Sequence, residues 1–179
     1  MLVNNAGFGA YGLFHRPDLG RLLEMIQVNI AAVVHLTHLY PPPMIERRRG
    51  DILIVASTAG FQAVPYITAY AATKGFDLLF AEGLAEEVRP YGIRVCALCP
   101  GSTHTEFRRV SGQPERTFRI AESVEKVARV GLRALAAGKS CVISGTHNKL
   151  MKQSQRLGPR RLTTRVAAKL LSPVEGNES

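Results

Sequence analysis

The chain has 179 residues, of which 46% are hydrophobic, and this is enough for a single domain with a buried core. Its formal net charge of +9 favours acidic partners such as nucleic acid, an anionic membrane surface or a phosphorylated cofactor. Three cysteines argue against a disulfide scaffold, and the sequence has neither a signal-peptide pattern at its start nor an apolar run of membrane-spanning length, so we expect a cytoplasmic protein.

Strand-like and helix-like segments alternate along the chain. Continuous apolar runs are typical of strands buried on both faces, and apolar residues that recur every three or four positions are typical of helices. In chain order, the expected elements are a strand at 1–3, a helix at 18–38, a strand at 51–56, a helix at 69–88, a strand at 93–98, a helix at 123–137 and a strand at 141–144. Pro41 breaks or kinks the first helix, and Ser123 caps the last one. This alternation implies right-handed crossovers and a parallel sheet.

Polar and glycine-rich segments follow three of the expected strands. They are Asn4–Gly7, Ser57–Gly60 and Pro100–Thr105. Because ligands of open parallel sheets bind at the carboxyl ends of the strands, we expect these segments to form one site. Tyr70 and Lys74 follow on the next helix, four residues apart and therefore on one face of it.

The Tyr-x-x-x-Lys pair alone is typical of many amphipathic helices, and the order of the surrounding motifs is what makes it informative. In chain order, these motifs are Asn-Asn-Ala-Gly at 4–7, Val-Asn at 28–29, Ile-Val-Ala-Ser-Thr-Ala-Gly at 54–60, Tyr-Ala-Ala-Thr-Lys at 70–74 and Cys-Pro-Gly-x-Thr-x-Thr-Glu-Phe at 99–107. Over residues 1–145 this order resembles the short-chain dehydrogenase/reductase family, and most of all its DltE-like bacterial oxidoreductases.

The resemblance implies an α/β fold with a Rossmann-like, doubly wound parallel sheet. It also implies an NAD(P)-dependent oxidoreductase that interconverts a small-molecule carbonyl and a secondary alcohol. The catalytic residues that it implies are Asn29, Ser57, Tyr70 and Lys74. The cofactor-binding residues that it implies are Asn5, Ala6, Gly7, Tyr70, Lys74, Pro100, Gly101, Thr103 and Thr105. The sequence does not identify the substrate, whose pocket is usually shaped by the segment that corresponds to residues 106–122.

Carbonyl reduction needs a hydride on carbon and a proton on oxygen. The nicotinamide supplies the hydride, and Tyr70 would supply the proton. The unperturbed tyrosine pKa of about 10 is too high for ready exchange near neutrality, so we expect the positive charges of Lys74 and of the oxidised nicotinamide to lower it. By resemblance, Lys74 also hydrogen-bonds the nicotinamide ribose, Ser57 holds the substrate oxygen, and Asn29 supports a water that links Lys74 to solvent.

The family's opening strand and Gly-rich turn, which hold the cofactor pyrophosphate, have no counterpart in this sequence. The segment that selects NADP or NAD is also absent, so the choice between them is not readable. The glycines at 7, 9 and 12 follow a later strand of the family's order, and we interpret them as loop. We therefore expect a partial sheet and predict that this chain alone binds NAD(P)H weakly or not at all. The alternatives are a catalytically inactive remnant of the family and a basic peripheral membrane or interaction protein.

The C-terminal segment is strongly basic, with seven Lys or Arg and no acid from Lys149 to Lys169. Apolar residues alternate with these charges in an amphipathic helical pattern that Gly158-Pro159 interrupts. We therefore divide the chain into residues 1–145, the family's domain, and residues 146–179, a basic amphipathic tail. A helix that packs on the domain and a helix that binds an anionic membrane surface both fit this pattern. Nucleic-acid binding is not expected, because the segment lacks aromatic residues for stacking.

Cys96 and Cys99 have the spacing of a redox or zinc pair. In a strand, residues three apart point to opposite faces, so we expect core packing and no metal site. The resemblance also implies a homodimer or homotetramer that assembles through the helices around Asn29 and Tyr70.

Overall fold

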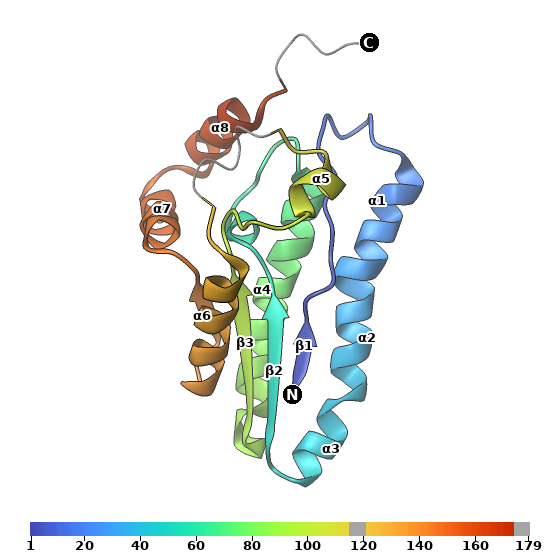
Figure 1. Ribbon diagram of the computed structural model, residues 1–179, viewed down its shortest axis with the longest axis vertical. Helices are drawn as coiled ribbons and strands as arrows, with labels where there is room; N and C mark the ends of the chain where they lie inside the picture. Colours follow the sequence, from blue (N-terminus) through green and yellow to red (C-terminus); the bar gives the residue numbers. More distant parts are fainter. Residues whose placement is uncertain (115–120, 174–179) are drawn as a thin grey trace.

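The computed structural model describes residues 1–114 and 121–173 and contains a parallel four-stranded sheet (Figure 1). The strands, in their order across the sheet, are β1 (Leu2–Asn4), β2 (Gly50–Val55), β3 (Ile93–Cys99) and β4 (Cys141–Ile143). In register, Ile52 of β2 lies beside Leu2 of β1 and Val95 of β3. The strands and their parallel pairing confirm the prediction of a Rossmann-like α/β fold.

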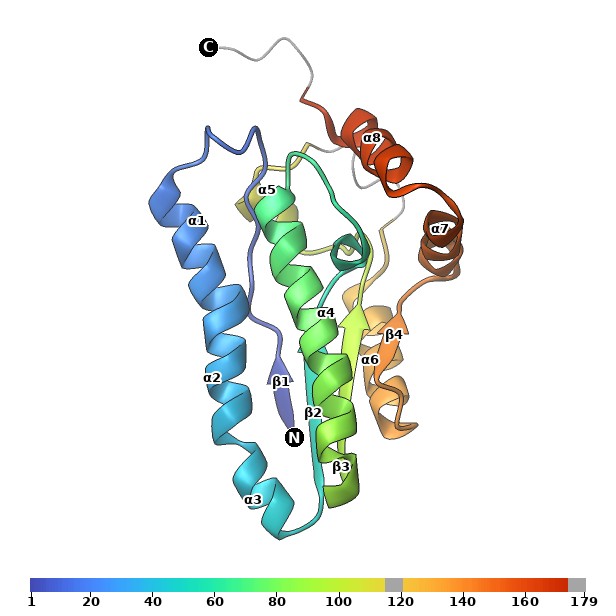
Figure 2. The same ribbon diagram turned by 180° about the vertical axis from the view of Figure 1, so that it is seen from behind.

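Helices cover both faces of the sheet (Figures 1 and 2). One face carries α1 (Leu19–Ile26), the π-helical turn η1 (Gln27–Ala31), α2 (Ala32–Leu39), α3 (Pro41–Glu46) and α4 (Thr68–Val88). The other face carries α6 (Val124–Ala136). The remaining elements are η2 (Thr58–Phe61), η3 (Arg89–Tyr91), α5 (Phe107–Ser111), α7 (Thr146–Leu157) and α8 (Arg160–Leu171). Of these, α5, α7 and α8 gather at the carboxyl ends of the strands, where the sequence predicts the site.

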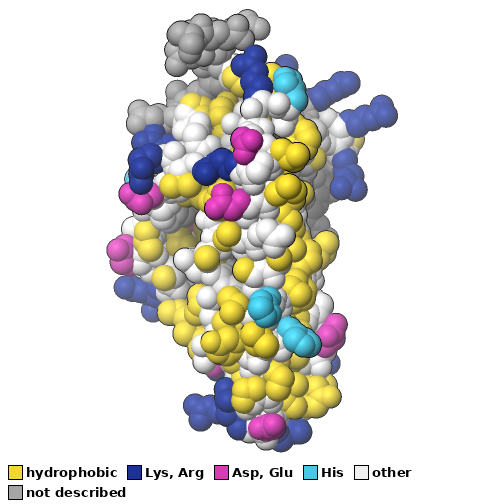
Figure 3. Space-filling view, turned by 90° about the vertical axis from the view of Figure 1, so that its right-hand side faces the viewer, with side chains coloured by type: hydrophobic (Ala, Val, Ile, Leu, Met, Phe, Trp, Pro, Cys, Tyr) yellow, Lys and Arg dark blue, Asp and Glu magenta, His cyan; other side chains and the backbone are white. Residues whose placement is uncertain are grey.

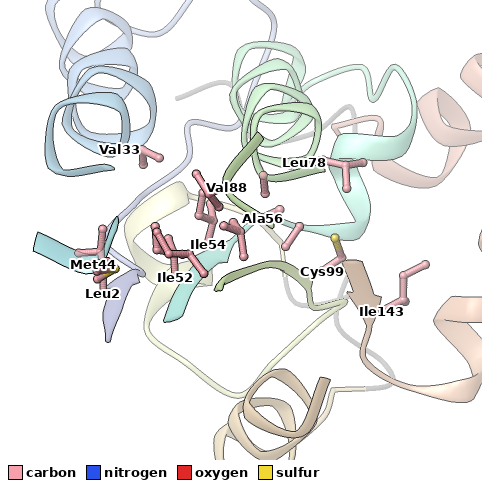
Figure 4. Close-up of a cluster of buried hydrophobic side chains, with 14 residues drawn as sticks. Leu2, Val33, Met44, Ile52, Ile54, Ala56, Leu78, Val88, Cys99 and Ile143 are labelled. Atoms are coloured by element: carbon pink, nitrogen blue, oxygen red, sulfur yellow. The ribbon is translucent and has the colours of Figure 1, made fainter. Parts of the chain in front are cut away.

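Strand β2 is buried on both of its faces. Ile52 and Ile54 pack into the cluster of side chains beneath α4, and Figure 4 shows them with Leu78 of that helix. Leu53, which points to the opposite face, packs with Val127 of α6. Because successive side chains of a strand alternate between faces, a strand covered on both sides needs a continuous apolar run.

Local signals in the sequence set several helix ends. Ser123 caps α6, where its hydroxyl accepts the backbone N–H of Lys126 at 3.3 Å, as predicted. Gly138 follows α6 with a φ of 70°, a conformation that favours glycine. Pro41 occupies the first turn of α3, where its missing N–H costs nothing. The short elements η2 and α5 are not predicted, because neither has enough residues to establish a periodic pattern.

The continuous helical stretch Leu19–Leu39 is long and apolar enough to cross a membrane, judged by length and composition alone. This corrects the expectation that no apolar run approaches that length. In this fold Leu22, Met25 and Val33 of the stretch are buried within the domain. Other apolar side chains lie on the outer surface of α1 and α2, which Figure 3 faces. They are Leu19, Leu23, Ile26, Val34, Leu36 and Leu39.

Candidate active site

The carboxyl ends of the strands open into one cavity of about 1270 Å³. Its lining includes Ser57, Tyr70 and Lys74, which come from the end of β2 and from α4. The cofactor-binding positions that also line it are Asn5, Gly7, Pro100, Gly101, Thr103 and Thr105. Ala6 and Asn29 do not belong to this lining. The structure therefore brings together three of the predicted catalytic residues and most of the predicted cofactor positions.

Ser57 lies directly after β2, in extended backbone conformation, and begins the short helix η2. Its Oγ accepts the backbone N–H of Ala59 at 3.1 Å, which orients the hydroxyl at the cavity wall. The Ser57 hydroxyl also lies close enough to Tyr70 to favour the ionised form of the phenol and so to lower its pKa. The two hydroxyl groups therefore lie within reach of one shared ligand atom.

Tyr70 is buried in the first turn of α4, and its ring centroid lies 5.0 Å from that of Phe107. Burial raises the pKa of Tyr70 to about 12, the nearby Ser57 hydroxyl opposes this rise, and the negative charge of Asp77 adds to it. The expectation of a lowered pKa is therefore wrong for the chain by itself. Desolvation of the phenolate outweighs the neighbouring ammonium group, whose charge a carboxylate offsets.

Lys74 is buried one turn after Tyr70, and its Nζ makes two hydrogen bonds. It donates to the backbone oxygen of Val55 at 2.8 Å and to Oδ2 of Asp77 at 2.9 Å. Asp77 is 1% exposed, and sequence reasoning missed it. The signal that could have found it is its position seven residues after Tyr70, which places a carboxylate on the same buried face of α4.

Asn29 lies in the π-helical turn η1 and is completely buried. Its Oδ1 accepts the N–H of Phe8 at 3.1 Å, and its Nδ2 donates to the Phe8 carbonyl and to the Thr73 hydroxyl, both at 3.0 Å. The side chain thus joins the loop after β1 to the helix that carries Tyr70. Its contacts hold the site together rather than face a ligand.

Two glycines in the cavity lining pack closely against neighbouring side chains. A Cβ on Gly7 would lie 3.0 Å from Oδ1 of Asn29 and 3.5 Å from Nζ of Lys74. A Cβ on Gly101 would collide with the side chain of Asn148. Because only glycine keeps the backbone this close to its neighbours, larger residues at these two positions would displace Asn29 or Asn148.

The outer wall of the cavity is apolar. Phe107 and Val110 of α5 line it, and so do Leu162, Val166 and Leu170 of α8, which recur every four residues along one stripe. The hydroxyl of Tyr11 donates to the backbone oxygen of Leu171 at 2.7 Å and anchors the end of α8. The C-terminal helix is therefore part of the site rather than a separate appendage.

The cysteines pack in the core. Cys96 and Cys99 belong to the clusters on opposite faces of the sheet, as their spacing predicts, and all three cysteines are free. Sγ of Cys99 lies 3.9 Å from Sγ of Cys141 on β4, a contact that sequence alone does not indicate. In the described ranges, no group of three or more His, Cys, Asp or Glu side chains could hold a metal ion.

Comparisons with known proteins identify a family model and several relatives. Residues 1–116 match the family model for short chain dehydrogenases. The very-long-chain 3-oxoacyl-CoA reductase of Anas platyrhynchos is 34% identical over 148 residues, which are 77% of this chain and 46% of that protein. The inactive 2-(S)-hydroxypropyl-CoM dehydrogenase 2 of Xanthobacter autotrophicus is 35% identical over 152 residues, 76% of this chain and 66% of that protein.

The fold has counterparts among solved structures. A short-chain dehydrogenase from Sphingobium yanoikuyae, solved in complex with NADPH, superposes with a TM-score of 0.77 at 25% identity. The match covers 99% of this chain and 66% of that one. The chain thus spans about half the length of several curated relatives and about two thirds of this structural neighbour.

Proposed function

Because this chain belongs to the short-chain dehydrogenase family, we propose that it interconverts a carbonyl and a secondary alcohol with an NAD(P) cofactor. The observation that carries the proposal is the placement of Ser57 and Tyr70 at the wall of one cavity, with Lys74 one turn further along α4. This arrangement offers two hydroxyl groups to one substrate oxygen and places an ammonium group beside them.

In the proposed reduction, the hydroxyl groups of Ser57 and Tyr70 hydrogen-bond the carbonyl oxygen of the substrate. A bound nicotinamide supplies the hydride to the carbonyl carbon. Tyr70 gives its proton to the oxygen as negative charge develops there, and the alcohol forms. Tyr70 is protonated near neutral pH, as the proton donor in this direction must be.

The residues that would hold the nicotinamide half of NADP or NAD come from the segments that follow β1 and β3. Gly7 lies close to Nζ of Lys74, and Asn5 lies near Gly7 in the loop after β1. Gly101, Thr103 and Thr105 lie in the cavity lining across from them. Ala6 is exposed and outside this lining, so we assign it no contact.

The apolar wall formed by α5 and α8 favours a substrate with an apolar substituent next to its carbonyl. Phe107, Val166 and Leu170 contribute this surface directly outside Tyr70. The Anas platyrhynchos relative is named for a very-long-chain 3-oxoacyl substrate, whose acyl group has this character. Residues 115–120 of the segment expected to shape the pocket lie outside the described residues.

Two further parts of the proposal concern assembly and location. The apolar outer surface of α1 and α2 suits a homodimer or homotetramer in the cytoplasm (Figure 3). On α8, Arg161 and Arg165 lie beside the partly exposed Leu162, and this edge of the 146–179 tail suits a weak peripheral contact with anionic lipid. Co-sedimentation with anionic vesicles tests the lipid contact, and a chain that stays in the supernatant excludes it.

A catalytically inactive member of the family is the second candidate, and the Xanthobacter autotrophicus relative named as inactive favours it. NAD(P)H oxidation in the presence of a panel of ketones separates the two candidates. The proposed function predicts ketone-dependent oxidation that Tyr70→Phe abolishes. An inactive chain gives the same background rate with and without ketone.

A further inference from the structure

Helix α4 carries three polar side chains on one buried face. Tyr70, Lys74 and Asp77 follow one another at spacings of four and three residues, which align side chains along a helix. Asp77 is 1% exposed and Lys74 is 5% exposed, and the next residues on this face, such as Leu78, belong to the apolar core (Figure 4). A carboxylate in such surroundings is costly unless a cation compensates it.

The compensating cation is Lys74. Its Nζ lies 2.9 Å from Oδ2 of Asp77, and its second hydrogen bond, to the oxygen of Val55, ties the ammonium group to the end of β2. The other carboxylate oxygen of Asp77, Oδ1, is buried and has no hydrogen-bond partner among the described residues. Lys74 is therefore held by Asp77 on one side and by the strand that leads to Ser57 on the other.

The Lys74–Asp77 pair also sets the charge around Tyr70. Burial raises the pKa of Asp77, and the charge and hydrogen bond of Lys74 oppose this rise. Among the described residues, the polar groups close to Lys74 include the neutral carbonyl of Val55 and the neutral side chain of Asn29. Since the carboxylate offsets the ammonium, Tyr70 gains less stabilisation of its phenolate than a lone lysine would give.

We propose that Asp77 is a positioning residue of this site, which holds the Lys74 ammonium against β2 and offsets its charge beside Tyr70. The inference rests on the proposed function, because protonated Tyr70 is the species that donates to a carbonyl oxygen. It adds that the ion pair limits how far Lys74 can stabilise the Tyr70 phenolate. Neither the Tyr-x-x-x-Lys motif nor the cavity lining implies this carboxylate.

Tyrosine labelled with ¹³C at Cζ reports the ionisation of Tyr70 by NMR in the complete chain, with its signal assigned from the Tyr70→Phe spectrum. Asp77→Asn keeps the shape of the side chain and removes its charge. It should lower the midpoint of the Tyr70 titration by about one pH unit, which is a tenfold rise in phenolate at a fixed pH. Asp77→Glu keeps the charge and should stay closer to the unchanged chain despite its extra methylene. Glu87→Gln, an exposed carboxylate on the same helix, should leave the midpoint unchanged.

The inference is overturned if Asp77→Asn leaves the midpoint of the Tyr70 titration unchanged or raises it. It is also overturned if Asp77→Glu moves the midpoint as far as Asp77→Asn, because a purely structural role depends on fit rather than on charge. If the variants do not fold, the unchanged chain gives a second readout. The ¹⁵Nζ signal of Lys74 should shift with the same midpoint as the ¹³Cγ signal of Asp77, and an independent Lys74 signal contradicts the pairing.

These measurements need no substrate and no nicotinamide. If the Tyr70 titrations give the expected midpoints but the chain oxidises no NAD(P)H with any ketone, the role of Asp77 is supported and the proposed function is contradicted. If the chain reduces ketones but Asp77→Asn leaves the Tyr70 titration midpoint unchanged, the proposed function is supported and the role of Asp77 is contradicted.

Discussion

Asn29 and Phe8 exchange two hydrogen bonds, since Oδ1 of Asn29 accepts the Phe8 N–H at 3.1 Å and Nδ2 of Asn29 donates to the Phe8 carbonyl at 3.0 Å. These two hydrogen bonds hold the loop after β1 against the π-helical turn η1. Without them, the partly buried backbone of Phe8 would have neither a strand nor a helix to satisfy its polar groups.

Asn29→Ala should lower the free energy of unfolding by about 2–3 kcal/mol, because it leaves the polar backbone groups of Phe8 without their partner. Gln27→Ala, at an exposed position of the same turn, should change it by less than about 0.5 kcal/mol. Urea unfolding followed by circular dichroism measures both values. Equal changes in the free energy of unfolding for the two substitutions would show that the Asn29–Phe8 hydrogen bonds do not stabilise the fold.

Gly60→Ala tests how closely η2 packs on α4. A Cβ at Gly60 would lie 2.5 Å from the backbone oxygen of Lys74, so η2 and Ser57 must move away from the helix. We expect a loss of about 1–3 kcal/mol in the free energy of unfolding. Gly83→Ala is the matched control within α4, since its Cβ meets nothing within 4 Å and should stabilise the helix by about 0.5–1 kcal/mol. Stabilisation by both substitutions would contradict the close packing.

The raised pKa of Tyr70, about 12, predicts how stability changes in alkaline solution. The unfolded chain loses the phenolic proton near the ordinary pKa of about 10, so folding favours the protonated form. The stabilisation is complete below about pH 10 and is lost as pH rises through the folded pKa. Relative to Tyr70→Phe, the unchanged chain should lose about 1 kcal/mol of unfolding free energy between about pH 9 and pH 11. Parallel curves for the two chains would mean that Tyr70 titrates normally.

Tyr11→Phe tests the anchor of α8. It removes the hydrogen bond from the Tyr11 hydroxyl to the oxygen of Leu171 and should weaken local closure by about 1 kcal/mol. Hydrogen–deuterium exchange in peptides of α8 should then be about five times faster, with other regions unchanged. Tyr91→Phe, in the distant η3, is the control. Unchanged exchange in α8 would show that other contacts hold the helix.

Periodic patterns and strand ends were sufficient to predict the main elements of the fold. The apolar run of β2 and the cap at Ser123 each encode their structure within a few residues, and the ends of the strands located Ser57. The α7–Gly158–α8 arrangement of the basic tail also follows the predicted interruption.

The features that sequence reasoning missed depend on tertiary contacts. The pairing of Asp77 with Lys74 requires both to be buried, and the direction of the Tyr70 pKa shift follows from that burial. The approach of Cys99 to Cys141 depends on the register of two strands 42 residues apart in sequence. The DltE-like subgroup, the NADP or NAD preference and weak cofactor binding by this chain alone stay predictions.

Transfer of deuterium from [4,4-²H₂]NAD(P)H to a ketone tests the central claim most directly, because it detects the chemical step even when the cofactor binds weakly. The chain is incubated with millimolar cofactor and an apolar ketone, and the alcohol is analysed by mass spectrometry. The account predicts one deuterium on the carbinol carbon with the unchanged chain and none above background with Tyr70→Phe. Equal labelling by both chains, or none by either, would contradict the assignment of Tyr70 as the proton donor of this site.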